Sequence, residues 1–246
     1  MNPCLLIPIY NHHETIHAVL SSLANIGLPC LVVDDGSDEE TVRVLETALR
    51  EFEWLAVERL PANQGRGFAL RHGYQLAARR GFSHVIQLDA DGQHDSADVP
   101  RFLDAARRAP EALILGDPVF DKTAPWSRLY GRKLSRFWVR IETLSSAIRD
   151  PLCGFRCFPL EPTVSVLGRN ALGDRMEFDP EIAVRLVWEG VAVFNLPTRV
   201  RYLPGGRSHF RPVRDNLRIS WMHARLFFGM LRRLPALLRR RGPRYA

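Results

Sequence analysis

The stretch VIQLDADGQHD, residues 85–95, runs from an apolar segment directly into a group of carboxylates. Its first four residues have the composition of a buried strand, and Asp89, Asp91 and Asp95 follow them. Carboxylates this close together repel one another unless a cation lies between them. A solvated turn would explain the same residues without a cation, so the rest of the sequence must distinguish the two interpretations.

The residues on the N-terminal side of this stretch alternate between strand and helix patterns. Apolar runs start at residues 4 and 30, and helical spacing of apolar residues fills 14–27, 39–52 and 67–81. This order predicts the α/β class, with a mostly parallel sheet flanked by helices. Ligands of such sheets bind beyond the carboxyl ends of the strands, which is where the polar clusters YNHHE, DDGSD and DADGQHD fall. We therefore expect these clusters to converge on one edge of the sheet.

Composition limits the class of protein. The chain has 246 residues, of which 46% are hydrophobic and 25% charged, and this suits one sizeable globular domain or two small ones. No apolar run approaches the ~18 residues that span a membrane. The four cysteines match no zinc spacing, so we expect reduced thiols in a cytosolic protein. The net charge of +7 suits an anionic partner, and nucleic acid is not expected because no recognition motif accompanies the charge.

The oxygen-rich cluster at residues 89–95 favours a hard divalent cation. Oxygen ligands suit Mg²⁺ or Mn²⁺, and such an ion keeps coordination positions open for phosphate oxygens. A calcium loop would need glycine at the position of His94. The cluster is therefore a candidate site for Mg²⁺ or Mn²⁺.

Six motifs follow one another along the chain. They are IPIYN (7–11), VVDDGSDEET (32–41), NQGRGFALRHG (63–73), LDADGQH (88–94), DPLCGFRCF (150–158) and EFDPEI (177–182). In this order and spacing, over about residues 3–210, they resemble the family 2 glycosyltransferases, and within that family the dolichyl-phosphate mannosyltransferase-like group. The resemblance implies the nucleotide-sugar-binding α/β fold named GT-A, and inversion at the sugar carbon.

The resemblance also implies a donor site. It assigns contacts with the base and ribose to Pro8, Tyr10 and Asp35. Arg66, between two glycines that let the backbone turn sharply or approach closely, would face the diphosphate. One position departs from the family, because His12 stands where glutamate usually follows YN, and this leaves the base contact there open.

At the metal site the resemblance implies a D-x-D pair, Asp89 and Asp91, with Gln93 helping to hold the ion. Asp91 would be the direct ligand of Mg²⁺ or Mn²⁺ and would take part in catalysis, and Asp89 would lie near the ribose or sugar. A divalent cation at this place would neutralise the charge that the departing diphosphate gains.

Two kinds of acceptor are compatible with the sequence. A hydroxyl acceptor needs a carboxylate base, and Asp179 stands where relatives with hydroxyl acceptors carry theirs. A phosphate acceptor is already anionic and needs arginines to position it. The resemblance assigns residues 124–138 to an acceptor loop, but Gly131 occupies the position of the arginine that should precede Ser135 by four residues. Acceptor-binding candidates from this loop and from a later loop are Arg128, Arg132, Ser135, Arg201, Arg207 and His209.

The C-terminal segment differs in composition from the rest of the chain. We expect a glycosyltransferase domain at 1–212 and a basic amphipathic helical tail at 213–246, as one helix or as two broken at Pro235. No Asp or Glu follows Asp215, and arginines recur every seven residues from Arg218. This pattern predicts binding of residues 217–246 to an anionic membrane surface. A helix packed on the domain with its arginines in water is the alternative.

Together these observations predict an inverting, metal-dependent glycosyltransferase. It would move a hexose from a nucleotide-diphospho-sugar to a membrane lipid, with polyprenyl phosphate as first choice, and would be cytoplasmic and peripheral on the inner face of the cell membrane. One alternative is a hydroxyl acceptor with Asp179 as base, and another is a non-catalytic sugar-nucleotide binder or membrane adaptor. A sugar nucleotidyltransferase would carry a glycine-rich basic loop after the first strand, and IPIYNHHE contains none.

Overall fold

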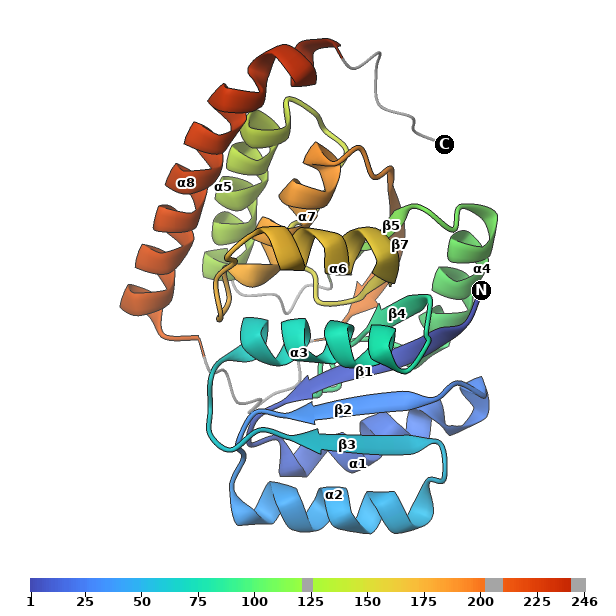
Figure 1. Cartoon of the computed structure of the whole chain (residues 1–246). Helices are drawn as coiled ribbons and strands as arrows, with labels where there is room; N and C mark the ends of the chain where they lie inside the picture. Colours follow the sequence, from blue (N-terminus) through green and yellow to red (C-terminus); the bar gives the residue numbers. More distant parts are fainter. Residues whose placement is uncertain (121–125, 202–209, 240–246) are drawn as a thin grey trace.

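The structure is a computed structural model that describes residues 1–120, 126–201 and 210–239, without the side chains of residues 126–129 (Figure 1). Seven strands in this part of the chain form one sheet in the order β3-β2-β1-β4-β6-β5-β7. Every neighbouring pair is parallel except the two that include β6. The predicted mostly parallel sheet is therefore confirmed. The strands are β1 (Pro3–Ile9), β2 (Cys30–Asp34), β3 (Leu55–Arg59), β4 (His84–Gln87), β5 (Leu113–Phe120), β6 (Arg156–Pro159) and β7 (Val193–Val200).

Helices cover both faces of the sheet. One core contains side chains of α1, α2 and α4, and the other contains side chains of α3, α5, α6, α7 and α8. Strand β1 serves both cores, because successive residues of a strand point to opposite faces: Leu5 and Ile7 enter the first core and Leu6 the second. The helices are α1 (His13–Leu23), α2 (Glu39–Glu51), α3 (Arg66–Arg79), α4 (Val99–Arg108), α5 (Trp126–Thr143), α6 (Leu160–Arg169), α7 (Phe178–Trp188) and α8 (Pro212–Arg239), with short 3₁₀ turns η1 (Ala24–Ile26) and η2 (Ser96–Asp98).

The observed helices start or end within a few residues of the predicted ones, and local chemistry explains where. Helix α2 begins after Asp38, whose Oδ1 accepts a hydrogen bond from the backbone N–H of Thr41 at 2.9 Å and so caps the helix. The predicted helix at 14–27 is α1 followed by the turn η1, which ends at Gly27 with a φ of 72°. Glycine adopts this left-handed conformation without a steric penalty, so the chain can leave the helix there.

The antiparallel strand β6 was not predicted, and it matters for the site. The parallel strands β1, β2 and β4 all end at the same edge of the sheet, as expected. Because β6 runs the other way between β4 and β5, it begins at that edge. The residues just before and at its start, Gly154 and Arg156, therefore join the polar clusters that follow the parallel strands.

The predicted C-terminal amphipathic helix is present as α8, which continues through Pro235. It packs beside α5 and α7 (Figure 1), and Met222, Leu226 and Met230 belong to the second core. The division into a domain at 1–212 and a tail at 213–246 stays a prediction. Within the described residues, no helix has the length and apolar composition needed to cross a bilayer.

Candidate active site

A cavity of about 1490 Å³ lies at the edge of the sheet where the polar clusters meet. Its walls come from the loops after β1, β2 and β4, from the first turns of α3 and α7, and from α5 and α8. The structure therefore brings many of the predicted site residues together around one cavity, and the role of each residue stays a prediction. The predicted site residues in the walls are Pro8, Tyr10, Asp35, Arg66, Asp89, Asp91, Gln93, Arg132, Ser135 and Asp179.

Four acceptor candidates are not among the described residues of the cavity wall. Arg201 is exposed, and its backbone N–H donates to the carbonyl oxygen of Gln93 at 3.0 Å. Arg207 and His209 lie outside the described residues, as does the side chain of Arg128.

Arg66 forms ion pairs with both Asp89 and Asp179, for which the sequence analysis predicted different roles. Its Nη2 donates to Asp89 Oδ1 at 2.5 Å, and its Nε donates to the same oxygen at 3.2 Å. Its Nη1 donates to Asp179 Oδ2 in a short contact. The guanidinium of Arg66 therefore lies between Asp89 and Asp179, and its contact with a diphosphate stays a prediction.

The second oxygen of Asp179 is also engaged. Asp179 Oδ1 accepts a hydrogen bond from Gln87 Nε2 at 3.2 Å and lies 3.8 Å from Arg156 Nη1. Gln87 is held in turn by the hydroxyl of Tyr74. Since Asp179 is buried, these donors surround a carboxylate that has little contact with water.

Arg156 is a site residue that the sequence analysis missed. It is fully buried on β6, where its guanidinium donates to the carbonyl oxygens of Cys153 and Pro151 at 2.6 Å each and of Asp179 at 2.7 Å. Burial lowers the pKa of Arg156 to about 10. A charged residue inside the apolar run GFRCF was the available signal, because an arginine is almost never buried without partners.

The D-x-D pair has the properties of a cation site. Burial alone would raise the pKa of Asp89, but the guanidinium of Arg66 and the nearby His94, at 3.4 Å, hold it well below its ordinary value. The pKa of Asp91 is raised, first by burial and then by the charge of Asp89. Among the described residues, no Lys, Arg or His forms an ion pair with Asp91, whose Oδ1 accepts from the backbone N–H of Gln93 at 3.0 Å. An under-compensated carboxylate of this kind fits Mg²⁺ or Mn²⁺.

Asp35 organises the loop that precedes α3. Its carboxylate accepts hydrogen bonds from Asn63 Nδ2 at 2.9 Å and from the backbone N–H groups of Gln64 and Gly65 at 2.8 Å each. Gly65 has a φ of 112°, and a Cβ there would lie 2.4 Å from the carbonyl oxygen of Asp174. The loop therefore requires glycine, and it brings the N-terminus of α3 close to the start of α7.

Helix α5 supplies the acceptor candidates that the structure describes. Ser135 is buried in the cavity wall. Arg132 Nη1 donates to Asp150 Oδ1 at 2.7 Å, and the guanidinium lies 5.0 Å from the ring centre of Phe120. These contacts fix the position of a positive charge at the cavity wall.

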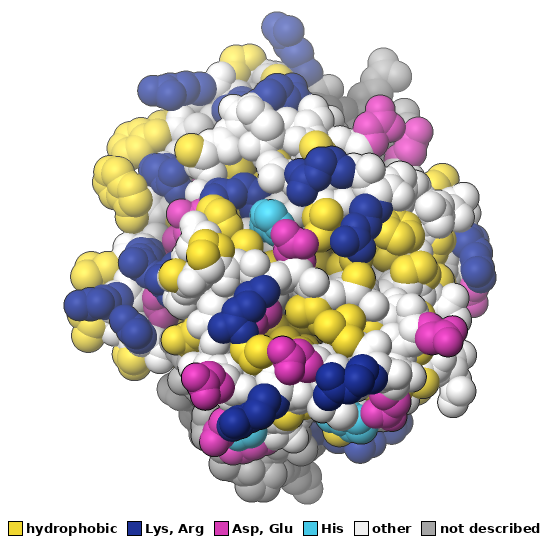
Figure 2. Space-filling model, turned by 60° about the horizontal axis from the view of Figure 1, so that its bottom comes forward, with side chains coloured by type: hydrophobic (Ala, Val, Ile, Leu, Met, Phe, Trp, Pro, Cys, Tyr) yellow, Lys and Arg dark blue, Asp and Glu magenta, His cyan; other side chains and the backbone are white. Residues whose placement is uncertain are grey.

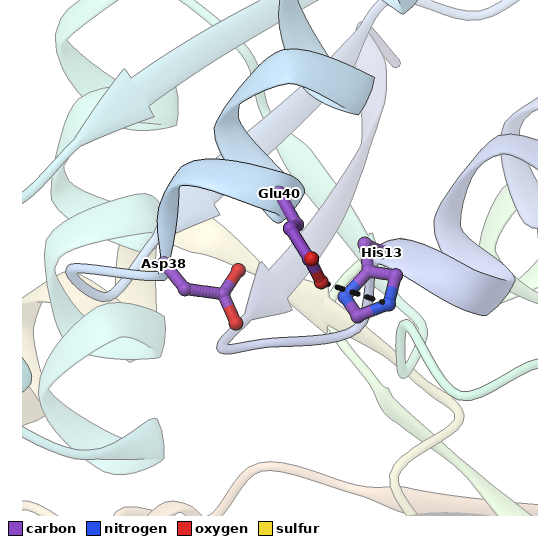
Figure 3. Close-up of side chains that lie close together, drawn as sticks. All are labelled: His13, Asp38 and Glu40. Carbon is purple, nitrogen blue, oxygen red and sulfur yellow. Dashed lines mark ion pairs between the residues drawn. The ribbon is translucent and has the colours of Figure 1, made fainter.

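A second group of potential metal ligands does not include the D-x-D pair. Figure 3 shows His13 beside Glu40, with Asp38 next to them. His13 Nε2 lies 3.4 Å from Glu40 Oε2, and Asp38 caps α2. A helix N-terminus disfavours a cation, and a cap with an exposed ion pair accounts for the three side chains. Asp89 and Asp91 therefore remain the residues for which we predict a metal site.

The chain belongs to the glycosyl transferase family 2, whose family model matches residues 4–162. It is accordingly a glycosyltransferase. Similar proteins include a polyprenol monophosphomannose synthase of Mycolicibacterium smegmatis, 30% identical over 200 residues that cover 78% of this chain and 75% of the relative. Another is an undecaprenyl-phosphate mannosyltransferase of Micrococcus luteus, 30% identical over 211 residues that cover 80% of this chain and 82% of the relative.

Solved structures support the GT-A fold. A glucosyl-3-phosphoglycerate synthase of Mycobacterium tuberculosis, in complex with Mn²⁺, UDP-glucose and phosphoglyceric acid, matches with a TM-score of 0.63 and 19% identity, over 93% of this chain and 79% of that chain. S. aureus TarS in complex with UDP-GlcNAc matches with a TM-score of 0.65 and 15% identity, over 92% of this chain and 66% of that chain.

Proposed function

We propose that this glycosyltransferase moves a hexose, with inversion, from a nucleotide-diphospho-sugar to the phosphate of a membrane lipid, and that the lipid is a polyprenyl phosphate. The observation that carries the proposal is the state of Asp179. Arg66 occupies one of its oxygens, and Gln87, with Arg156 nearby, occupies the other. Both oxygens of Asp179 therefore already accept hydrogen bonds within the protein, which disfavours this carboxylate as the base for a hydroxyl acceptor, whereas a phosphate acceptor needs no base.

The arrangement suits a single displacement. A phosphate oxygen of the acceptor would form a bond with the anomeric carbon of the sugar while the bond from that carbon to the diphosphate breaks. The acceptor must then approach from the side opposite the diphosphate. Arg132 and Ser135 on α5 lie in the cavity wall and would position the acceptor phosphate there. Relatives named for polyprenol and undecaprenyl-phosphate acceptors support this choice of substrate.

On the donor side, Asp35 and the loop at 63–65 would hold the nucleoside, and Asp89, Asp91 and Gln93 would hold Mg²⁺ or Mn²⁺. The bound cation would neutralise the departing diphosphate. The similar structure that contains Mn²⁺ and UDP-glucose supports a divalent ion. When the donor binds, Arg66 would exchange Asp89 for a phosphate oxygen and keep its contact with Asp179, because a guanidinium pairs with a carboxylate or with a phosphate.

We also propose that the protein is peripheral on the membrane face where its soluble donor is present. Helix α8 has two apolar faces: one enters the core, and the other carries exposed side chains at intervals of three, four or seven residues. Figure 2 shows hydrophobic and basic side chains beside each other along the left edge of the molecule, the side on which Figure 1 shows α8. This combination suits an anionic bilayer. The exposed apolar residues of α8 are Val213, Leu217, Trp221, Phe228, Leu231 and Leu238.

The attachment should be tested with surface substitutions. Removal of α8 would also remove Met222 and Leu226 from the core, so a truncated protein would not isolate the membrane contact. Trp221→Ser should lower co-sedimentation with anionic liposomes, and Leu49→Ser, on the exposed side of α2, is the control. Equal sedimentation of the two variants would refute the attachment through α8.

Label transfer tests the reaction itself. The purified protein is incubated with Mg²⁺ or Mn²⁺, a panel of radiolabelled nucleotide sugars and a membrane lipid extract, and the organic phase is counted and then treated with mild acid. Acid-labile label indicates a glycosyl phosphate and supports the proposal. Acid-stable label indicates a glycoside and would return the choice to a hydroxyl acceptor. No label in the organic phase would refute a lipid acceptor.

A further inference from the structure

We propose that the groove between α5 and α8 holds the hydrocarbon chain of the acceptor lipid; this rests on the proposed function and extends it. The cavity of the active site does not end at Asp179 and the acceptor candidates. It continues between the two helices, where its walls include Leu134 and Trp138 of α5 and Phe227 and Phe228 of α8. One continuous cavity therefore has a charged end and an aromatic end.

Along both helices, from the N-terminal to the C-terminal end, the wall changes from polar or charged residues to aromatic ones. On α5 the polar residues Arg132 and Ser135 precede Trp138 by about two turns and about one turn. On α8 the wall residue Arg214 belongs to the first turn, and Phe227 comes about three and a half turns later. The aromatic ends meet, because the ring centres of Trp138 and Phe227 lie 6.4 Å apart in an edge-on arrangement. An amphiphile with an anionic head and an apolar chain fits this order of charges and aromatic rings.

The rim of the groove is open to the side. Tyr130, Leu134 and Phe228 belong to the cavity wall, yet they are 73%, 52% and 63% exposed. Large apolar side chains at the rim of a cavity are costly in water and mark a binding surface. They continue the exposed apolar face of α8 that we propose lies on the bilayer. A lipid could therefore slide its chain between the helices while its end remains in the membrane.

The base of the groove is held rigidly by buried polar contacts. His223, 6% exposed, lies in the wall with its ring centre 6.2 Å from that of Trp138. Its Nδ1 lies 2.8 Å from Oε1 of the fully buried Glu142, and Trp188 Nε1 donates to the Glu142 carbonyl oxygen at 2.8 Å. A preformed surface of this kind binds an apolar chain without a large ordering cost.

The groove is short. From Tyr130 to Trp138 the wall of α5 extends roughly 12 Å, at the rise of an α-helix. It would therefore hold only the part of the chain next to the phosphate. This length predicts that affinity for prenyl phosphates rises with the first isoprene units and then levels off.

The test compares two soluble acceptors, dimethylallyl phosphate and farnesyl phosphate, in detergent-free buffer. The measured quantity is the ratio of their kcat/KM values. We expect the native enzyme to prefer farnesyl phosphate, and Leu134→Ser to reduce the preference about tenfold. Ala224→Trp, which would fill the groove, should bring the ratio close to one. Leu49→Ser is the matched control, because Leu49 is a half-exposed leucine on α2 and should leave the ratio unchanged.

Each variant must first bind the donor nucleotide with native affinity by calorimetry, which shows that it is folded. If Leu134→Ser and Ala224→Trp both transfer the sugar with the native preference for farnesyl phosphate, the groove does not hold the lipid chain, although the proposed function stands. Failure of the native enzyme to use either phosphate would overturn the proposed function, and the assignment of the groove with it.

Discussion

Gly154 stands directly behind the first carboxylate of the D-x-D pair, and its substitution gives the sharpest prediction. A Cβ at residue 154 would lie 2.0 Å from Asp89 Oδ2 and 2.7 Å from its Cγ. Non-bonded heavy atoms settle at about 3.5 Å, so Gly154→Ala must displace the Asp89 carboxylate by more than about 1 Å. A displacement of this size costs about 100-fold in rate, or about 2.7 kcal/mol of transition-state stabilisation.

The assay is kcat/KM for the donor in the presence of Mn²⁺, together with the melting temperature. The φ of Gly154 lies outside the left-handed region, so alanine fits the backbone and we expect the fold to persist. Gly168→Ala is the matched control: Gly168 is exposed near the end of α6, and a Cβ there meets open space. It should retain activity and gain up to about 1 kcal/mol of stability. A folded Gly154→Ala enzyme with native kcat/KM would refute the reasoning.

Three further predictions concern the metal, a buried pair and pH. Asp91→Ala should abolish the Mn²⁺-dependent part of donor binding; an unchanged calorimetric affinity would remove the metal site. Glu142→Ala should lower the free energy of unfolding by about 3–5 kcal/mol, because it leaves His223 buried without its partner, and Glu142→Gln should cost less; equal urea midpoints of the two variants would contradict this. Burial lowers the pKa of His84 from its ordinary 6.5, although its Nε2 donates to the Pro110 carbonyl oxygen at 2.8 Å. The unfolded chain then binds the proton of His84 more readily than the folded protein does. The contribution of His84 to the free energy of unfolding is therefore complete above the unfolded pKa of about 6.5, and it is lost as the pH falls through the lower pKa of the folded state. Urea unfolding between pH 5 and 8 should show this slope, and His84→Gln should flatten it; an identical slope in the variant would count against the assignment.

The location of the site could be predicted from the sequence because it depends on local patterns. Strand and helix periodicities are properties of neighbouring residues, and the rule that parallel strands end at one edge needs no knowledge of their order. Asp35 and Asp89 come one and two residues after the ends of their strands, so their convergence required only the class of sheet. The motifs added the identity of the family.

The contacts within the site could not be predicted in the same way. Arg66 and Asp179 are 113 residues apart, and the strand that places Arg156 beneath Asp179 runs antiparallel to its neighbours. Neither fact leaves a periodic signal in the sequence. Helix α8 shows the same limit: its composition predicts an amphipathic helix, but its position beside α5 depends on long-range packing.

The single guanidinium of Arg66 links Asp89 and Asp179, the two carboxylates to which we assign the donor side and the acceptor side of the candidate site. Substitution of Asp89 would free Arg66 to pair more fully with Asp179, and substitution of Asp179 would do the reverse. Losses from the two changes should therefore not add in a double-mutant cycle. If Asp89 contacts the sugar as we propose, a substitution made there to change the sugar preference would also alter the environment of Asp179. Libraries should therefore vary both carboxylates together with Arg66.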